Sequence, residues 1–244
     1  MSVLVVGASG GTGRLVVEQL LHSGKRVKII VRNKTNLSQY AQTHPKLTII
    51  KANILAISDE QLARIVQDCS AVISTLGHTL SFRGVFSAPR TLVTDATQKL
   101  CEAIISHNAN KKVKFILMNS SGVRNPDLNE IISSAQKMVI FTLCHILPPH
   151  RDNEQAATYL RAKIGGCHPQ VTWVSIRPDA LVNHLQESAY EMYPSPTRSA
   201  IFNSGICSRI NVASAMRDLV IDDLLWEKWQ GSMPVLYNSA QIEI

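Results

Sequence analysis

Short apolar runs alternate with longer amphipathic stretches along most of this chain. The runs predict strands at residues 3–6, 26–31, 47–51, 71–75, 113–118 and 171–176, and the stretches between them predict helices at 12–23, 59–67, 92–108 and 154–164. The runs are apolar nearly throughout, as strands covered on both faces require, whereas half-exposed strands would alternate. The sequence therefore predicts an α/β fold built on a doubly wound parallel sheet.

The last quarter of the chain has a different pattern. A Pro-rich loop at 193–196 precedes an expected short strand around 200–202, a helix at 212–225 and a final strand at 235–237. We expect residues 1–244 to form one domain, with 179–244 as a small C-terminal subregion that packs over the carboxyl edge of the sheet and shapes a substrate pocket.

Composition excludes several functional classes. The net charge of +7 comes from dispersed basic residues, so no nucleic-acid-binding face is expected, and the excess positive charge suits an anionic ligand. The most apolar run, 138–149, is well short of the roughly 20 residues that cross a bilayer, and the N-terminus has no secretory pattern. Five scattered cysteines and eight histidines without metal-ligand spacing predict free thiols in a cytoplasmic protein without a metal site.

A glycine-rich turn follows the first predicted strand and opens the first predicted helix. Gly7 would let the chain turn sharply, Gly10 would let the backbone approach a diphosphate, and Gly13 would let the helix lie close to the sheet. The helix N-terminus would add N–H groups and partial positive charge. A purely structural glycine turn is the alternative. The expected dinucleotide-binding residues here are Gly7, Ser9, Gly10, Gly11, Thr12 and Gly13.

The end of the second predicted strand favours NADP(H) over NAD(H). An acid usually stands there in proteins that select NAD, but residues 25–44 contain no Asp or Glu, and Arg32 stands in its place. A guanidinium can pair with a 2′-phosphate, and Lys34 or Ser38 could add a contact. The alternative is a solvent-facing Arg32 in an NAD-binding protein.

Further cofactor contacts are expected where other strands end. Asn53 follows the third strand and could meet the adenine edge. Leu76 and Gly77 follow the fourth, where Gly77 would leave room for the nicotinamide-side ribose.

Together these motifs resemble the atypical short-chain dehydrogenase/reductases, in the branch that holds biliverdin/flavin reductases and NADP-sensing transcriptional co-regulators. The matching residues are Gly7-x-x-Gly10-x-x-Gly13, Val31-Arg32-Asn33, Asn53, Ser120-Ser121 and Ile176-Arg177-Pro178. The resemblance implies a Rossmann core with NADP across the strand ends, Pro178 near the nicotinamide and Ser120 on the nicotinamide side.

One departure from this family concerns the Tyr-x-x-x-Lys pair of its dehydrogenases. Pro149 and Asn153 align with the two positions of that pair. Tyr159 and Lys163 have the right spacing, but they lie too late on the predicted helix to match it. The standard proton-transfer dyad is therefore expected to be absent.

Three segments should converge over the nicotinamide: 76–90, 118–124 and 150–154. His150 is the first candidate proton donor, with Ser120 and Arg151 beside it and His78 as a second candidate. The alternative for this stretch is a helix start capped by Asp152 or Asn153 with His150 merely exposed, and Ser120 could equally satisfy nearby backbone groups.

Two further features have open interpretations. Arg83 and Arg90 could recognise an anionic substrate or a cofactor phosphate, or remain solvated. The apolar stretch 139–147 could line a pocket for a planar substrate, or serve core packing or a dimer contact.

The sequence thus leaves two functional hypotheses. The first is an NADPH-dependent reductase that acts on a small conjugated or aromatic acceptor such as a flavin or quinone. The second is a non-catalytic NADP(H) sensor that regulates a protein partner. We expect a small-molecule substrate, no membrane or nucleic-acid partner, and a monomer or homodimer.

Overall fold

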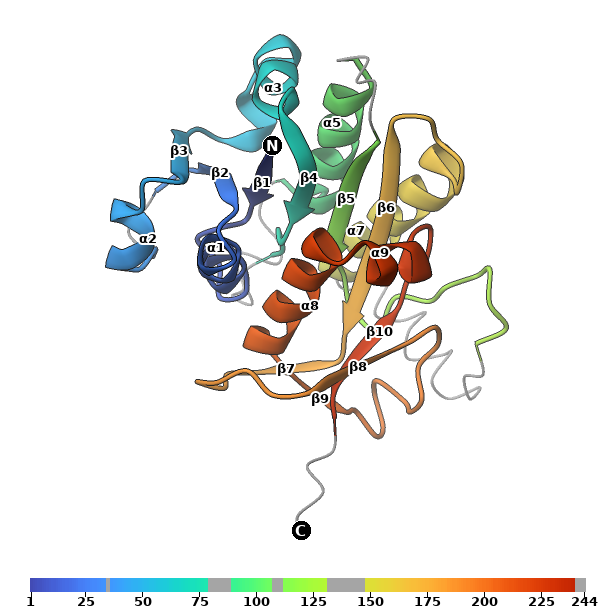
Figure 1. Cartoon of the computed structure of the whole chain (residues 1–244). Helices are drawn as coiled ribbons and strands as arrows, with labels where there is room; N and C mark the ends of the chain where they lie inside the picture. Colours follow the sequence, from blue (N-terminus) through green and yellow to red (C-terminus); the bar gives the residue numbers. More distant parts are fainter. Residues whose placement is uncertain (34–35, 79–88, 107–111, 131–147, 240–244) are drawn as a thin grey trace.

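An eight-stranded sheet forms the centre of the molecule, with strand order β3-β2-β1-β4-β5-β6-β10-β8 (Figure 1). The computed structural model describes residues 1–33, 36–78, 89–106, 112–130 and 148–239. β8 runs antiparallel to β10, and the other neighbouring strands pair in parallel. A separate two-stranded parallel sheet joins β7 and β9. The strands are β1 (Ser2–Val6), β2 (Arg26–Val31), β3 (Leu47–Lys51), β4 (Cys69–Ser74), β5 (Val113–Met118), β6 (Val171–Pro178), β7 (Ala180–Val182), β8 (Tyr190–Tyr193), β9 (Ile206–Ser208) and β10 (Val235–Asn238).

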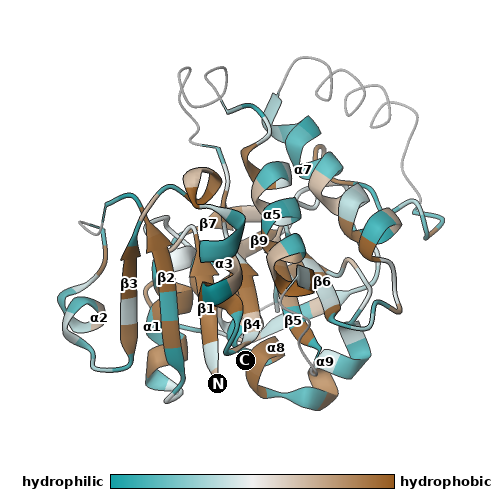
Figure 2. Cartoon of the chain, turned by 90° about the horizontal axis from the view of Figure 1, so that it is seen from above, coloured by the Kyte–Doolittle hydropathy of each residue, from teal (hydrophilic) through white to brown (hydrophobic). Residues whose placement is uncertain are grey.

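Helices cover both faces of this sheet, so the predicted doubly wound α/β fold is confirmed. One face packs against α1 (Gly13–His22), α8 (Arg209–Ile221) and α9 (Asp223–Trp229). The other packs against α3 (Asp59–Val66), α5 (Leu92–Ser106) and α7 (Pro148–Tyr159). Figure 2 shows the apolar strands running between these helices. The remaining short elements are α2 (Gln39–Thr43), the 3-10 turn η1 (Ile54–Ala56) and the π-helical turn η2 (Leu160–Ile164).

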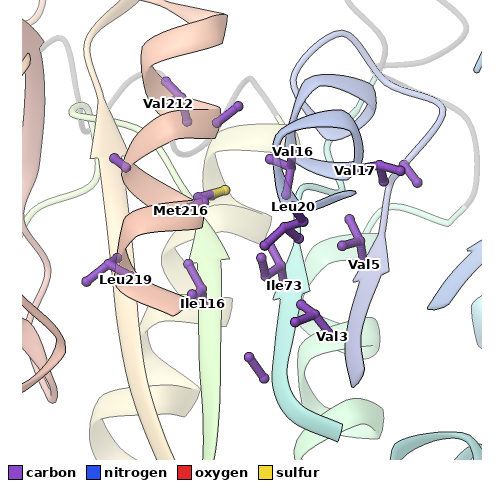
Figure 3. Packing of buried hydrophobic residues seen from close by; sticks show 14 of the residues in the cluster. Val3, Val5, Val16, Val17, Leu20, Ile73, Ile116, Val212, Met216 and Leu219 are labelled. Atoms are coloured by element: carbon purple, nitrogen blue, oxygen red, sulfur yellow. The ribbon is translucent and has the colours of Figure 1, made fainter. Parts of the chain in front are cut away.

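The apolar patterns of strands and helices meet in the core. Every residue of β1 is buried, as a central strand with helices on both sides requires. Leu20 of α1 and Met216 of α8 belong to the buried cluster over Ile73 and Ile116 of the sheet (Figure 3). This packing fixes α1 and α8 side by side on the sheet.

β1 and β4 are neighbours in the sheet, and the strand order reverses between them. β2 and β3 follow on the β1 side, whereas β5 and β6 follow on the β4 side. In open α/β sheets, ligands bind outside the carboxyl ends of the strands at such a switch point. The glycine-rich turn that follows β1 lies there.

Two expectations for the last quarter were wrong. Residues 200–202 form a turn, because Ser199 Oγ accepts hydrogen bonds from Ile201 N and Phe202 N, and the strand lies later, at β9. The helix expected at 212–225 is two helices, because the Asp222 carboxylate caps a new helix start by accepting from Leu225 N at 3.0 Å.

Helix α7 also begins earlier than residue 154. Pro148 and Pro149 occupy its first turn. Proline is tolerated there because the backbone N–H groups of the first turn have no carbonyl partner within the helix. Its continuation at residues 160–164 widens into the π-helical turn η2. His150, Arg151 and Asp152 therefore lie within the helix instead of before it.

Candidate functional site

The glycine-rich turn is sterically tight in the way a dinucleotide loop requires. Gly7 has φ +79°, a conformation that favours glycine. A Cβ on Gly13 would lie 2.2 Å from the carbonyl oxygen of Gly7 and 2.5 Å from Thr75 Oγ1. A Cβ on Gly10 would lie 3.2 Å from the same carbonyl, which accepts a hydrogen bond from Gly10 N at 2.9 Å. These glycines let α1 begin directly against the ends of β1 and β4.

The start of α1 can hold an anion. Thr12 makes no side-chain cap, and the first turn of the helix contains no acidic residue. A helix N-terminus of this kind carries partial positive charge that suits a diphosphate.

A cavity of about 450 Å³ lies beside this turn, on the side of β2. Asn36 borders it and donates from Nδ2 to the carbonyl oxygen of Ser9 at 3.3 Å, whereas Ser38 Oγ is used to cap α2 through Ala41 N. The lining residues are Ser9, Gly11, Arg14, Glu18, Asn36, Leu37 and Ser38. The position fits the adenosine end of a dinucleotide.

Arg14 lines this cavity and Arg32 does not, although Arg32 was the residue singled out from the sequence. Both side chains are exposed, and neither has a hydrogen bond or ion pair to another described residue. Arg14 is the first residue after the glycine motif, and that position on the exposed face of α1 was the signal that sequence reasoning missed. Lys34 lies outside the described residues.

Asn53 lies just after β3, and Leu76 and Gly77 lie just after β4. Asn53 is exposed, and its Oδ1 accepts from Leu55 N at 3.2 Å to cap η1, so only its amide NH₂ could face an adenine. Leu76 is half-buried, and Gly77 is exposed with open space where a Cβ would stand. Space for a ribose exists at Gly77, but nothing in the free protein there requires a glycine.

Ser120 and His150 come together at the end of β5, as the sequence predicted. A Cβ on Gly122 would lie 3.6 Å from Ser120 Oγ and 3.5 Å from His150 Cε1, so both side chains lie beside the same point. Ser120 Oγ accepts from Gly122 N at 3.2 Å, which is the backbone role that the sequence left open. Its hydroxyl hydrogen can still be donated to a ligand.

His150 is half-buried beside the end of β5. Its Nε2 is buried without a hydrogen-bond partner among the described residues, and Glu154 Oε1 lies 3.7 Å away. Burial lowers the pKa of His150 below the usual value, and the Glu154 carboxylate opposes this effect. The lowered pKa favours the neutral ring, whose Cε1 and Nδ1 lie 3.5 and 3.8 Å from the Cβ position at Gly122, beside Ser120.

Asp152 connects three elements instead of capping its own helix. Its buried carboxylate accepts from Val93 N at 2.8 Å and Thr94 N at 2.9 Å at the start of α5, and it contacts His78 Nε2 at 2.8 Å. The side chain of His78 is only 4% exposed, so this contact holds the ring at the end of β4. Capping of α7 by Asp152 is thereby excluded.

Pro178 links the end of β6 to the loop after β5. Pro178 is buried at the end of β6, and its carbonyl oxygen accepts from Ser121 N at 3.0 Å. Ser121 Oγ donates to Asp179 Oδ1 at 3.0 Å, and Gly205 N donates to Asp179 Oδ2 at 2.8 Å. Asp179, which sequence reasoning missed, thus joins the loop after β5 to the segment before β9.

Other candidates lie apart from this cluster or outside the described residues. Arg151 and Arg90 are exposed, without a hydrogen bond or ion pair to another described residue. Burial raises the pKa of Tyr159 to about 12 while Lys163 is exposed, so the late Tyr-x-x-x-Lys spacing does not make an activated pair. Arg83 and the stretch 139–147 fall outside the described residues.

Within the described ranges, no group of His, Cys, Asp and Glu side chains could hold a metal ion. The four cysteines seen there, Cys69, Cys101, Cys167 and Cys207, are free thiols. Across those same ranges, no helix has the length and apolar character needed to cross a membrane.

Comparison with known proteins identifies the kind of domain. Residues 7–223 match the model of a protein family described as NAD(P)H-binding. An uncharacterized chloroplastic protein of Arabidopsis thaliana is 28% identical over 196 residues, or 80% of this chain. The chain spans only 64% of the length of that relative.

Solved structures share the fold over nearly the whole chain. A short-chain dehydrogenase/reductase of Veillonella parvula in complex with NADP superposes with a TM-score of 0.69 and 15% identity, covering 98% of this chain and 95% of that one. An anaerobillin reductase of Escherichia coli O157:H7 superposes with a TM-score of 0.65 and 18% identity, covering 98% of each. The resemblance to the atypical short-chain dehydrogenase/reductases is thus confirmed for the fold.

Proposed function

Because the chain belongs to the NAD(P)H-binding family, we propose that it is an NADPH-dependent reductase of the atypical short-chain dehydrogenase/reductase class. Its substrate is a small conjugated or aromatic acceptor, such as a flavin or a quinone. The observation that carries this proposal is the His150 ring beside Ser120, at the edge of the sheet where the glycine turn lies, with its Nε2 buried and without a hydrogen-bond partner among the described residues. An acceptor with a conjugated carbonyl or imine would satisfy that nitrogen.

The described residues fit a nicotinamide dinucleotide. The cradle at Gly7 and Gly13 has no room for a Cβ, and the start of α1 favours a diphosphate. Arg14 and Arg32 are exposed cations without partners among the described residues, and Arg14 lines the cavity beside the glycine turn. They support NADP(H) over NAD(H), because a guanidinium pairs well with a phosphate.

The chemistry divides between the cofactor and the chain. NADPH supplies the hydride, and a proton must reach the acceptor atom that does not take the hydride. His150 is placed to donate that proton, while the Ser120 hydroxyl orients the acceptor carbonyl. Asp152 holds the His78 ring at the end of β4.

A non-catalytic NADP(H) sensor is the second candidate. The observation that favours it is the absent dyad, since Pro149 and Asn153 stand at its positions and Tyr159 has a raised pKa. The deciding experiment measures oxidation of NADPH against flavins, quinones and aldehydes, together with calorimetric titration of NADP⁺ and NAD⁺. Turnover supports the reductase, whereas tight binding without any turnover supports the sensor.

The role of His150 is tested by the pH profile of kcat. Its acidic form grows as the pH falls below the usual value of about 6.5, so kcat should rise over that range. His150→Gln should remove this rise, and His22→Gln, an exposed histidine at the far end of α1, should keep it. An unchanged profile in His150→Gln would exclude His150 as the donor.

Protein stability has to be measured in parallel. Since the folded-state pKa of His150 is lowered, its protonation favours the unfolded chain. Its contribution to stability is therefore complete above about pH 6.5 and is lost as the pH falls through the lowered pKa. Activity is interpretable only where the folded fraction is unchanged.

Cofactor selectivity is tested by Arg32→Glu and Arg14→Gln. Each should reduce the preference for NADP⁺ over NAD⁺, because each removes a cation from the adenosine side. Equal selectivity in both variants and the wild type would contradict the 2′-phosphate assignment. The proposal also includes a cytoplasmic location and a monomer or homodimer, which fractionation and light scattering would test.

A further inference from the structure

Arg209 lies against the glycine turn although it is nearly two hundred residues away in sequence. A Cβ on Gly11 would be 3.2 Å from both Cδ and Nε of Arg209. Gly11 is exposed at this point, so the arginine stem runs along the open side of the turn. Only the missing side chain of Gly11 leaves room for it.

The position of Arg209 is fixed by how α8 packs. Arg209 is the first residue of α8, whose start is capped by Ser208 Oγ accepting from Asn211 N at 3.3 Å. Gln19 of α1 donates from Nε2 to the carbonyl oxygen of Ile210 at 3.2 Å. The helix that begins at the glycine turn therefore holds the start of α8 directly.

Arg209 has no counter-charge among the described residues. Its Nη1 donates to Asn183 Oδ1 at 2.9 Å, a neutral amide just beyond β7. Among the described residues it has no carboxylate partner, whereas Arg217 on the same helix pairs with Glu187 and Asp218. A half-buried guanidinium held in place without a counter-charge is suited to an anionic ligand.

We infer that Arg209 is a second clamp on the cofactor diphosphate, opposite the start of α1. This inference rests on the proposed NADP(H) binding and extends it to the C-terminal part of the chain. The diphosphate would accept hydrogen bonds from the turn on one side and from the guanidinium on the other. Since Asn183 orients the same guanidinium, this amide is a positioning residue.

The experiment compares ligands that differ in the diphosphate. NADP⁺ contains it, whereas adenosine 2′-phosphate keeps only the adenosine end. Calorimetry on Arg209→Gln should show NADP⁺ bound at least about tenfold more weakly, as expected for a hydrogen-bonded charge, with adenosine 2′-phosphate changed less than about twofold. Arg209→Lys should recover part of the loss, and Asn183→Ala should show a smaller loss than Arg209→Gln.

The controls separate this inference from the proposed function. Arg64→Gln removes an equally positive, largely exposed side chain from α3 and should bind both ligands like the wild type. Thermal unfolding of each variant without ligand checks that the fold is retained. Unchanged NADP⁺ affinity in Arg209→Gln, or equal weakening of both ligands, would overturn the clamp alone. Absence of NADP⁺ binding in the wild type would overturn the clamp and the proposed function together.

Discussion

At the scale of single residues, Gly13 is the position where one added methyl group does most damage. Its Cβ would overlap the Gly7 carbonyl and the buried Thr75 Oγ1, so the backbone of the turn would have to shift. Gly13→Ala should lower the free energy of unfolding by about 1–3 kcal/mol, the usual cost of overpacking, and abolish NADP⁺ binding. Urea unfolding and calorimetry measure both. Gly166→Ala is the matched control, because open space surrounds that position, and it should behave like the wild type.

At the scale of elements, Arg177 joins the end of β6 to three loops. Its fully buried guanidinium donates to the carbonyl oxygens of Val123, Pro194 and Met233 and lies 2.7 Å from Glu130 Oε1. Arg177→Met should lower the free energy of unfolding by about 3–5 kcal/mol, because it leaves a buried carboxylate unpaired. The half-exposed Arg217 gives the comparison: Arg217→Met should cost only about 0–1 kcal/mol. If urea unfolding gave the same loss of unfolding free energy for Arg177→Met and Arg217→Met, this role of Arg177 would be contradicted.

At the scale of the whole molecule, cofactor binding and folding should be linked. The proposed diphosphate site would draw on β1, α1 and, through Arg209, α8, which lie in different parts of the chain. NADP⁺ at about one hundred times its Kd should add about 2.7 kcal/mol to the stability of the folded chain. A rise in Tm of roughly 6–10 °C should follow for a chain of this length. NAD⁺ at the same concentration should give a smaller rise, and Gly13→Ala should give none with either ligand.

The sequence predicted those strands whose position depends on the local residue pattern, and it failed for strands that depend on distant contacts. β2, β3 and β5 lie where they were expected, because each is a short, mostly apolar run, even though β3 is an edge strand with no fully buried residue. β9 was misplaced, because the apolar residues at 200–202 turn on the Ser199 hydroxyl while pairing with β7 selects residues 206–208. Short strands of this kind depend on tertiary contacts that no local pattern reveals.

The candidate site shows the same division. The glycine spacing predicted the turn, and the meeting of Ser120 with His150 followed from the order of the strands. The roles of Asp152 and Arg209 could not be predicted, since each acts on an element distant in sequence. Asp152 resembled a local helix cap, yet its carboxylate binds the start of α5 instead.

That same carboxylate has a consequence for protein engineering. Asp152 contacts His78 at the end of β4 and Val93 and Thr94 at the start of α5. One carboxylate therefore fixes the two points between which residues 79–92 run. Sequences of different length could be grafted between His78 and Val93, because these hydrogen bonds keep the two ends in place.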